Sequence, residues 1–93
     1  MAVEVRHNTD EQQYEVWVDG TRAGLAVARE EGDVVVFPHT EVDEAFEGQG
    51  LASTLVTAAL DDVRARGKQV QAVCPYVKRF IAKHEEYQDL LVG

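Results

Sequence analysis

The segment "EAFEGQGLAST", residues 44–54, separates two hydrophobic patterns and decides how the chain folds. Before it the apolar residues alternate, as they do in strands, and after it they recur every three or four positions, as they do in a helix. Gly48 and Gly50 stand where that helix begins. Because glycine is costly to order, two of them at this point indicate either a backbone shape that other residues cannot adopt or a ligand that approaches the backbone closely.

Length and composition indicate one small domain that spans residues 1–93. Of the 93 residues, 45% are hydrophobic and 28% are charged, as in ordinary globular proteins. No apolar run approaches the roughly 20 residues that cross a membrane, and the amino-terminal residues lack the apolar core of a signal peptide. We therefore expect a cytoplasmic protein without membrane partners. A single cysteine, Cys74, excludes an internal disulfide and a cysteine-rich zinc site.

The charge distribution bears on the class of ligand. A formal charge of −8 argues against nucleic-acid partners, whose phosphates are bound by Lys and Arg. Residues 1–47 hold twelve acidic and three basic side chains, whereas residues 48–93 hold five acidic and six basic ones. An anionic ligand is expected to prefer the second part and an amine the first. No spacing of His, Asp and Glu residues indicates a metal site.

Alternating apolar residues predict an antiparallel meander of four strands, at residues 3–8, 14–18, 23–30 and 34–37. The last of these, "VVVF", is apolar at every position, so it should lie centrally with both faces covered. Pro38 cannot donate a hydrogen bond to a neighbouring strand. The sequence therefore predicts a bulge, a bend or a lost partner directly before His39.

A helix, a fifth strand and a second helix follow the meander. Apolar residues recur at helical spacing from Leu51 to Arg66, and Gly67 is a typical helix end. The segment "KQVQAVC", residues 68–74, predicts a strand that a right-handed crossover would place parallel to the fourth. A C-terminal helix is expected after Pro75. The predicted fold class is α+β, with five strands in one mixed sheet and two helices.

Gly48 and Gly50 are interpreted as part of an anion site. The start of a helix presents unpaired N–H groups and a partial positive charge, and glycines let an anion reach the backbone. A pyrophosphate is the ligand that this geometry suits best. The alternative is that the two glycines only form a turn.

From this loop onward the residues resemble a known family. "EGQGLA", residues 47–52, is similar to the acetyl-CoA signature of the GNAT superfamily of N-acetyltransferases. Gly50 and Ala52 match its glycine and its last position, and Glu47 stands where Arg or Gln is usual. The HTEV segment that begins at His39 and a Cys-Pro-aromatic segment resemble those of small single-domain GNAT-like proteins. The resemblance implies a GNAT-like fold and a single acetyl-CoA-binding domain.

The resemblance also implies where acetyl-CoA would bind. The fourth strand would offer its main chain to the pantetheine arm near Glu41 and Val42. Lys78, Arg79 and Lys83 would meet the remaining phosphate, or would simply be solvated. The amides of the loop would hold the pyrophosphate. The hydroxyls of Ser53 and Thr54 would assist, unless these two are ordinary first-turn residues. The full set of predicted cofactor-binding residues in the loop is Gly48, Gln49, Gly50, Leu51, Ala52, Ser53 and Thr54.

Cys74 and His39 are the candidate catalytic residues. The resemblance places Cys74 where the strands part around the thioester, and a thiolate there would accept the acetyl group transiently or relay a proton. Its alternative is a small buried apolar residue. His39 would act as a base or orient Cys74, or would be a polar residue at a strand end. Tyr76, near the cofactor, and Tyr87 are possible substitutes for the tyrosine that protonates CoA in many larger enzymes, although packing is the alternative for both.

The function implied is an acetyl-CoA-dependent N-acetyltransferase that passes the acetyl group to an amine, directly or through Cys74. CoA would be the cosubstrate, and no metal is expected. The alternative is a non-catalytic CoA- or acyl-CoA-binding sensor or interaction module. Larger GNAT enzymes carry helices between the first two strands that shape the acceptor site, and the segment "NTDEQQ" is too short for one. The acceptor is therefore unidentified from the sequence.

Overall fold

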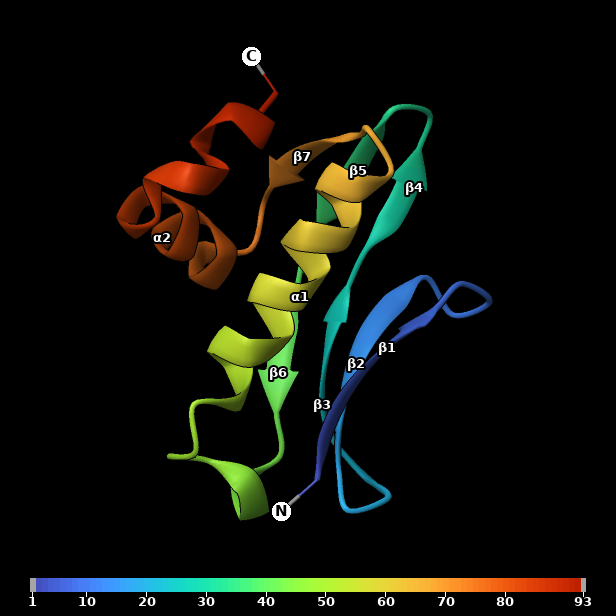
Figure 1. Cartoon of the computed structure of the whole chain (residues 1–93), viewed down its shortest axis with the longest axis vertical. Coiled ribbons are helices and arrows are strands. Elements are labelled where there is room, and N and C mark those ends of the chain that lie inside the picture. Colours follow the sequence, from blue (N-terminus) through green and yellow to red (C-terminus); the bar gives the residue numbers. More distant parts are fainter. Residues whose placement is uncertain (1, 93) are drawn as a thin grey trace.

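A computed structural model describes residues 2–92, in which seven strands, two α-helices and two 3₁₀ segments follow one another along the chain (Figure 1). In chain order they are β1 (Val3–Asn8), β2 (Gln13–Val18), β3 (Thr21–Val27), β4 (Arg29–Glu31), β5 (Val34–Phe37), β6 (Thr40–Val42), η1 (Glu44–Phe46), α1 (Leu51–Ala65), β7 (Gln69–Ala72), α2 (Pro75–Lys83) and η2 (Glu85–Leu90). Neither helix of the described chain has the length and apolarity that a bilayer crossing requires. The predicted α+β class is confirmed.

The strands form two sheets that share one core. The first sheet is antiparallel, in the order β1-β2-β3-β6, and the second has the order β4-β5-β7. Strand β5 is central in the second sheet and nearly all of it is buried, as its uniformly apolar sequence predicts. β5 and β7 run parallel, with Val34 opposite Gln69. The predicted parallel crossover through α1 is thereby confirmed.

The boundary between the sheets lies at Pro38. Arg29 is opposite Val36 on the second sheet, whereas Ala26 is opposite Thr40 on the first. Between these pairs the chain from β5 to β6 has three residues, 37–39, and the chain from β3 to β4 has two, 27–28. One extra residue on one of two paired strands is the definition of a β-bulge. Proline cannot donate to the ladder. The expected third strand is divided into β3 and β4 at this level, and the expected fourth strand, which is β5, is followed by the separate strand β6. The predicted interruption before His39 is confirmed, and it splits the expected single sheet in two.

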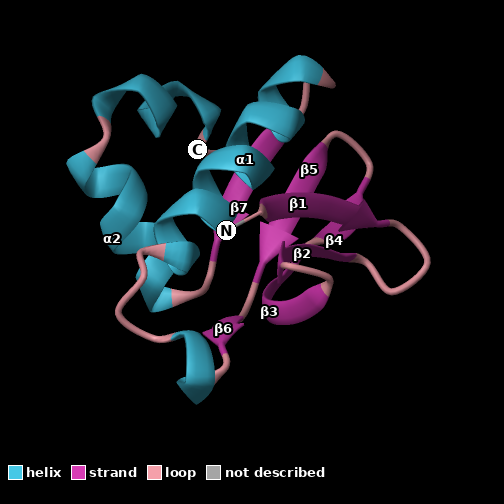
Figure 2. Ribbon diagram, turned by 60° about the horizontal axis from the view of Figure 1, so that its bottom comes forward, coloured by secondary structure: helices cyan, strands magenta, loops and turns pink. Residues whose placement is uncertain are grey.

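Helix α1 packs its apolar side against the strands. Its buried residues recur at helical spacing and meet the inward-facing residues of β2 and β3. Figure 2 shows both helices on one side of the molecule and strands β1 to β4 on the other. Strand β1 leads into β2 through a turn at residues 9–12. The buried residues of α1 are Leu51, Leu55, Val56, Ala59, Leu60 and Val63.

Hydrogen bonds and ion pairs attach the end of α1 to both sheets. The hydroxyl of Tyr14 donates to Asp62 at 2.5 Å and accepts from Arg66 at 2.9 Å. Arg66 also contacts both carboxylate oxygens of Glu30, at 2.9 and 3.1 Å, and Lys68 contacts Glu30 at 2.7 Å. These contacts hold the carboxyl end of α1 against β2 of the first sheet and β4 of the second.

Candidate functional site

The loop before α1 combines left-handed glycines with open space. Gly48 has a φ of +81° and Gly50 a φ of +71°, a region that L side chains rarely adopt. A Cβ added at either glycine would meet no atom within 4 Å, and Gln49 between them is exposed. Gly50 is the N-cap residue of α1, and no side chain caps this helix. The first intrahelical bond runs from the amide of Thr54 to the carbonyl of Gly50, so the amides of residues 51–53 precede it and have no partner within the helix.

The other predicted loop residues differ in what their side chains do. Leu51 is buried in the core, and Ala52 is half-buried. The hydroxyl of Thr54 donates to the carbonyl of Gly50 at 3.3 Å, so it is engaged within the helix. Ser53 is exposed. Of the two hydroxyls in this segment, that of Ser53 is therefore the one that can bind a ligand, in addition to the backbone amides.

Strand β6 lies at the edge of the first sheet and has free main-chain groups. Backbone hydrogen bonds of 2.8 Å join β3 to His39 and to Asp43, on either side of β6. Because bonding direction alternates along an antiparallel strand, Glu41 also faces β3, whereas the main-chain groups of Thr40 and Val42 face away from it. Of the two residues predicted to meet pantetheine, Val42 offers a free main chain.

The two sheets part at Phe37. The N–H groups of Val73 and Cys74 both donate to the carbonyl of Phe37, at 3.1 and 2.8 Å. Beyond this point β6 follows the first sheet, and the chain after β7 turns into α2. The predicted strand over residues 68–74 is too long, because Cys74 is the N-cap residue of α2 and Pro75 takes a first-turn position.

Cys74 is surrounded by hydrogen-bond donors. Its side chain is buried, with 4% of the residue exposed, and Sγ lies 3.6 Å from Oγ1 of Thr40. Burial acts to raise the pKa of Cys74, but the amide of Val77, the hydroxyl of Thr40 and the amides of Tyr76 and Thr40 together hold this pKa below its usual value. The surroundings thus favour a thiolate, as they do in other cysteines at helix starts.

His39 and Cys74 have different partners. The His39 ring is 59% exposed, and its Nε2 lies 3.4 Å from a carboxylate oxygen of Glu41. Thr40 lies between His39 and Glu41 in the sequence, and its hydroxyl contacts Cys74. Sequence reasoning did not identify Thr40. The alternation of side chains along a strand could have identified Thr40, because it places this residue on the face opposite His39 and Glu41.

A pocket of about 220 Å³ lies between the start of α1 and α2. Arg79 and Lys83 from the predicted basic group line it, and Lys78 does not. Tyr76 is half-buried here, and burial raises its pKa. Phe80 and His84 were not predicted to be at the site, although their spacing of four residues puts them on one helix face. The lining consists of Ser53, Tyr76, Arg79, Phe80, Lys83 and His84.

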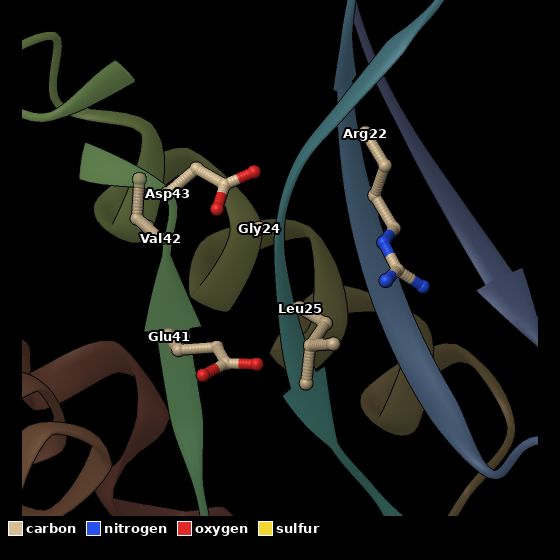
Figure 3. A pocket seen from close by; sticks show the side chains of 6 residues that line it. All are labelled: Arg22, Gly24, Leu25, Glu41, Val42 and Asp43. Atoms are coloured by element: carbon tan, nitrogen blue, oxygen red, sulfur yellow. The ribbon is translucent and has the colours of Figure 1, made fainter. Parts of the chain in front are cut away.

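A second pocket, of about 110 Å³, lies between β3 and β6 (Figure 3). The carboxylates of Glu41, in β6, and of Asp43, directly after it, both point toward β3, and Leu25 lies nearest Glu41. Arg22 is on the far side of this pocket. Two carboxylates near an apolar side chain are suited to a ligand that carries positive charge.

Comparisons with known proteins agree with this geometry. A family profile described as GCN5-related N-acetyl-transferase matches residues 13–90. Protein NATD1 of Bos taurus is 31% identical over 84 residues, which cover 88% of this chain and 74% of that protein.

Two solved structures share the fold. A GCN5-like protein from Staphylococcus aureus, determined in solution by NMR, superposes with a TM-score of 0.73 at 22% identity, over 97% of this chain and 88% of that one. N-acetylglutamate synthase from Neisseria gonorrhoeae, solved with coenzyme A and N-acetyl-glutamate, superposes with a TM-score of 0.63 at 14% identity, over 87% of this chain and 21% of that one. Given the profile match over most of its length, the chain belongs to the GCN5-related N-acetyltransferase family.

Proposed function

We propose that residues 1–93 form one acetyl-CoA-binding domain that transfers an acetyl group from acetyl-CoA to an amine. Family membership supports acetyl transfer in general. The single observation that carries the proposal is the free edge of β6. It begins at Thr40 beside Cys74 and leads along the chain to the open amides at Gly50. A thioester and its phosphates can lie along such a path.

The residues along this path suit the parts of CoA. The amides of residues 51–53 would hold the pyrophosphate, because no side chain caps them and the two glycines before them leave the approach open. The main chain of Val42 would bind the amides of pantetheine. Arg79 and Lys83 would bind the remaining phosphate in the pocket that Tyr76 and Ser53 also line. The neighbour from Neisseria gonorrhoeae, which was solved with coenzyme A, supports this assignment by its fold.

The acetyl group would pass to the amine by one of two routes. In direct transfer the amine nitrogen attacks the thioester carbonyl, the bond from carbon to sulfur breaks, and the departing CoA thiolate takes up a proton while the amine loses one. In the second route the Cys74 thiolate attacks first and releases CoA, and the amine then attacks the acetyl-cysteine thioester and frees Cys74. The lowered pKa of Cys74 supports the second route. It needs a reduced thiol, which the cytoplasm would maintain.

The acceptor would be an amine that carries positive charge, such as a lysine side chain or a polyamine. The pocket that Glu41 and Asp43 line supports this choice, because it is acidic; it lies across β6 from the proposed thioester path. His39 would take the proton from the attacking amine. It is exposed and lies beside Glu41, on the side of β6 that bears this pocket.

Two measurements test the proposal. The protein is mixed with acetyl-CoA and either a lysine peptide or spermidine, and CoA release is followed with a thiol reagent. Its melting temperature is also measured with CoA, since ligand at about 100 times its dissociation constant adds roughly 2.7 kcal/mol to the free energy of unfolding. CoA binding without CoA release would favour a CoA-binding sensor, which is consistent with His39 pairing with Glu41 while Cys74 contacts Thr40. The absence of both effects would reject the domain assignment itself.

A further inference from the structure

We propose that Thr40 is the positioning residue for Cys74, whose sulfur it holds by a hydrogen bond at the point where the two sheets part. The inference rests on the proposed role of Cys74 in acetyl transfer. When the sulfur is a thiol, its S–H donates to Oγ1 of Thr40 at 3.6 Å. When it is a thiolate, the Thr40 hydroxyl donates to the sulfur instead.

The backbone around Thr40 holds its side chain in a defined position. Thr40 is the first residue of β6 and lies opposite Ala26 on β3. Backbone hydrogen bonds on either side of it, at His39 and Asp43, fix this part of β6 to β3. Threonine is branched at Cβ, which restricts the rotation of its side chain. The hydroxyl therefore has a defined position without help from the sulfur.

Groups from two separate parts of the fold lower the pKa of Cys74. The amides of Tyr76 and Val77 belong to the start of α2, which follows β7 of the second sheet. Thr40 belongs to the first sheet and crosses the gap to reach the same atom. Among the groups that lower the pKa of Cys74, the Thr40 hydroxyl is the one side chain. The other groups are backbone amides, so the Thr40 hydroxyl is the hydrogen-bonding group that a substitution can remove.

Charged groups nearby do not supply the same effect. His39 and Glu41, on either side of Thr40, pair with each other, and adjacent strand residues face opposite sides. Tyr76 on α2 lines the pocket that contains Arg79 and Lys83. The influences on the pKa of Cys74 are burial and hydrogen bonds, with no ion pair among them. Since Cys74 is only 4% exposed, water is poorly placed to replace a lost donor.

The test is the titration of the sulfur in the free protein. The sequence has one cysteine, so thiolate absorbance in the ultraviolet, after subtraction of a Cys74→Ala blank, reports Cys74 alone. Thr40→Val should move the titration midpoint to higher pH and slow alkylation by iodoacetamide at neutral pH by about tenfold, because a charge-assisted hydrogen bond is lost. Thr40→Ser keeps the hydroxyl and should titrate like the wild type. Thr57→Val, at a half-buried threonine of α1, is the matched control and should also titrate like the wild type.

Three results would overturn the inference. They are an unchanged midpoint in Thr40→Val, an equal shift in Thr40→Ser, or an equal shift in Thr57→Val. Melting temperatures of the variants establish that each one is folded. The titration needs neither CoA nor an acceptor, so its outcome is separate from that of the proposed function. A protein that fails to release CoA can still show the coupling of Thr40 to Cys74, and an active one can lack it.

Discussion

A Cβ atom at Gly24 would lie 2.6 Å from the carbonyl oxygen of Glu41 on the neighbouring strand. It would also lie 3.2 Å from the Cα of Val42. Strands β3 and β6 can approach this closely only because position 24 has no side chain. The position of β6, and with it the path from Cys74 to the loop, depends on this glycine.

Gly24→Ala should therefore destabilise the protein and displace β6. Overpacking of this kind costs about 1–3 kcal/mol, which a denaturant titration measures. CoA binding should weaken in addition, because the main chain of Val42 moves. Gly20→Ala is the control. Its site is a turn with a φ of +84° and no atom within 4 Å of the added Cβ, so it should lose stability by strain and keep its CoA affinity. Gly24→Ala with wild-type stability would contradict the steric account.

Gly50→Asn tests the phosphate loop. Asparagine tolerates the left-handed conformation better than other side chains, so the fold should survive while the carboxamide occupies the open space before the amides. The stabilisation by CoA in a thermal melt should be lost. Gly67→Asn is matched, since Gly67 has a φ of +70° and nothing within 4 Å of an added Cβ, but lies at the other end of α1. Normal CoA stabilisation of Gly50→Asn would mean that the glycines only form a turn.

Cys74→Ala separates the two routes of acetyl transfer. The loop amides are untouched, so CoA should still bind, whereas transfer through the thiol should be lost. Cys74→Ser should be nearly as poor, because a hydroxyl is a much weaker nucleophile than a thiolate. Intact-mass measurement after mixing the wild type with acetyl-CoA alone should show one added acetyl group, absent from the alanine variant. Full turnover by Cys74→Ala would leave direct transfer as the route.

Arg79→Gln and Lys83→Gln test the pocket at α2. Each variant should bind CoA about tenfold more weakly, because it loses a charge-assisted contact to phosphate. Binding of dephospho-CoA, measured by calorimetry, should change little. Lys78→Gln is the control, because Lys78 is exposed and does not line the pocket. Equal losses for CoA and dephospho-CoA would place the contacts elsewhere on the cofactor.

Glu30 should make stability depend on pH. Hydrogen bonds from Arg66, with the contact from Lys68, hold the pKa of Glu30 at about 2, below its ordinary value of 4.5. A lowered pKa stabilises the fold above about pH 4.5, and this contribution is lost as the pH falls toward 2. Its size is on the order of 2–3 kcal/mol.

Glu30→Gln should remove this contribution. Denaturant titrations at several pH values should show the variant less stable than the wild type at neutral pH and converging with it in acid. Glu31→Gln is the control, because Glu31 is 59% exposed and lies 3.9 Å from Arg29. A constant difference between Glu30→Gln and the wild type down to pH 2 would refute this role of Glu30.

Local signals predicted most of the fold. Apolar periodicity located α1 and the central strand β5, and Pro38 marked the break between the sheets. The end of β7 was missed, because the pattern over residues 68–74 continues past the point where Pro75 starts a helix. The chain's hydrogen bonds, more than its apolar pattern, decide such boundaries.

The site was predictable only in part. The glycine loop is local in sequence, so its left-handed conformations and its position at the start of α1 could be inferred. The contact of Thr40 with Cys74 could not, because it joins residues on separate sheets whose spacing is set by tertiary packing. The pairing of His39 with Glu41 is local by contrast, because residues two apart on a strand share a face.

The parallel pairing of β5 with β7 has a consequence for the order of folding. The hairpins of β1, β2 and β3 close over short turns, whereas the pairing of Val34 with Gln69 spans a segment that includes the whole of α1. Contacts of long sequence separation form late, since the entropy of closing the loop precedes any gain from pairing. The contact of Thr40 with Cys74, 34 residues apart in the chain, is of the same long-range kind. The thiol would therefore gain its partner at the end of folding, and a chain with formed hairpins but an undocked β7 would hold Cys74 as an ordinary solvent-exposed cysteine.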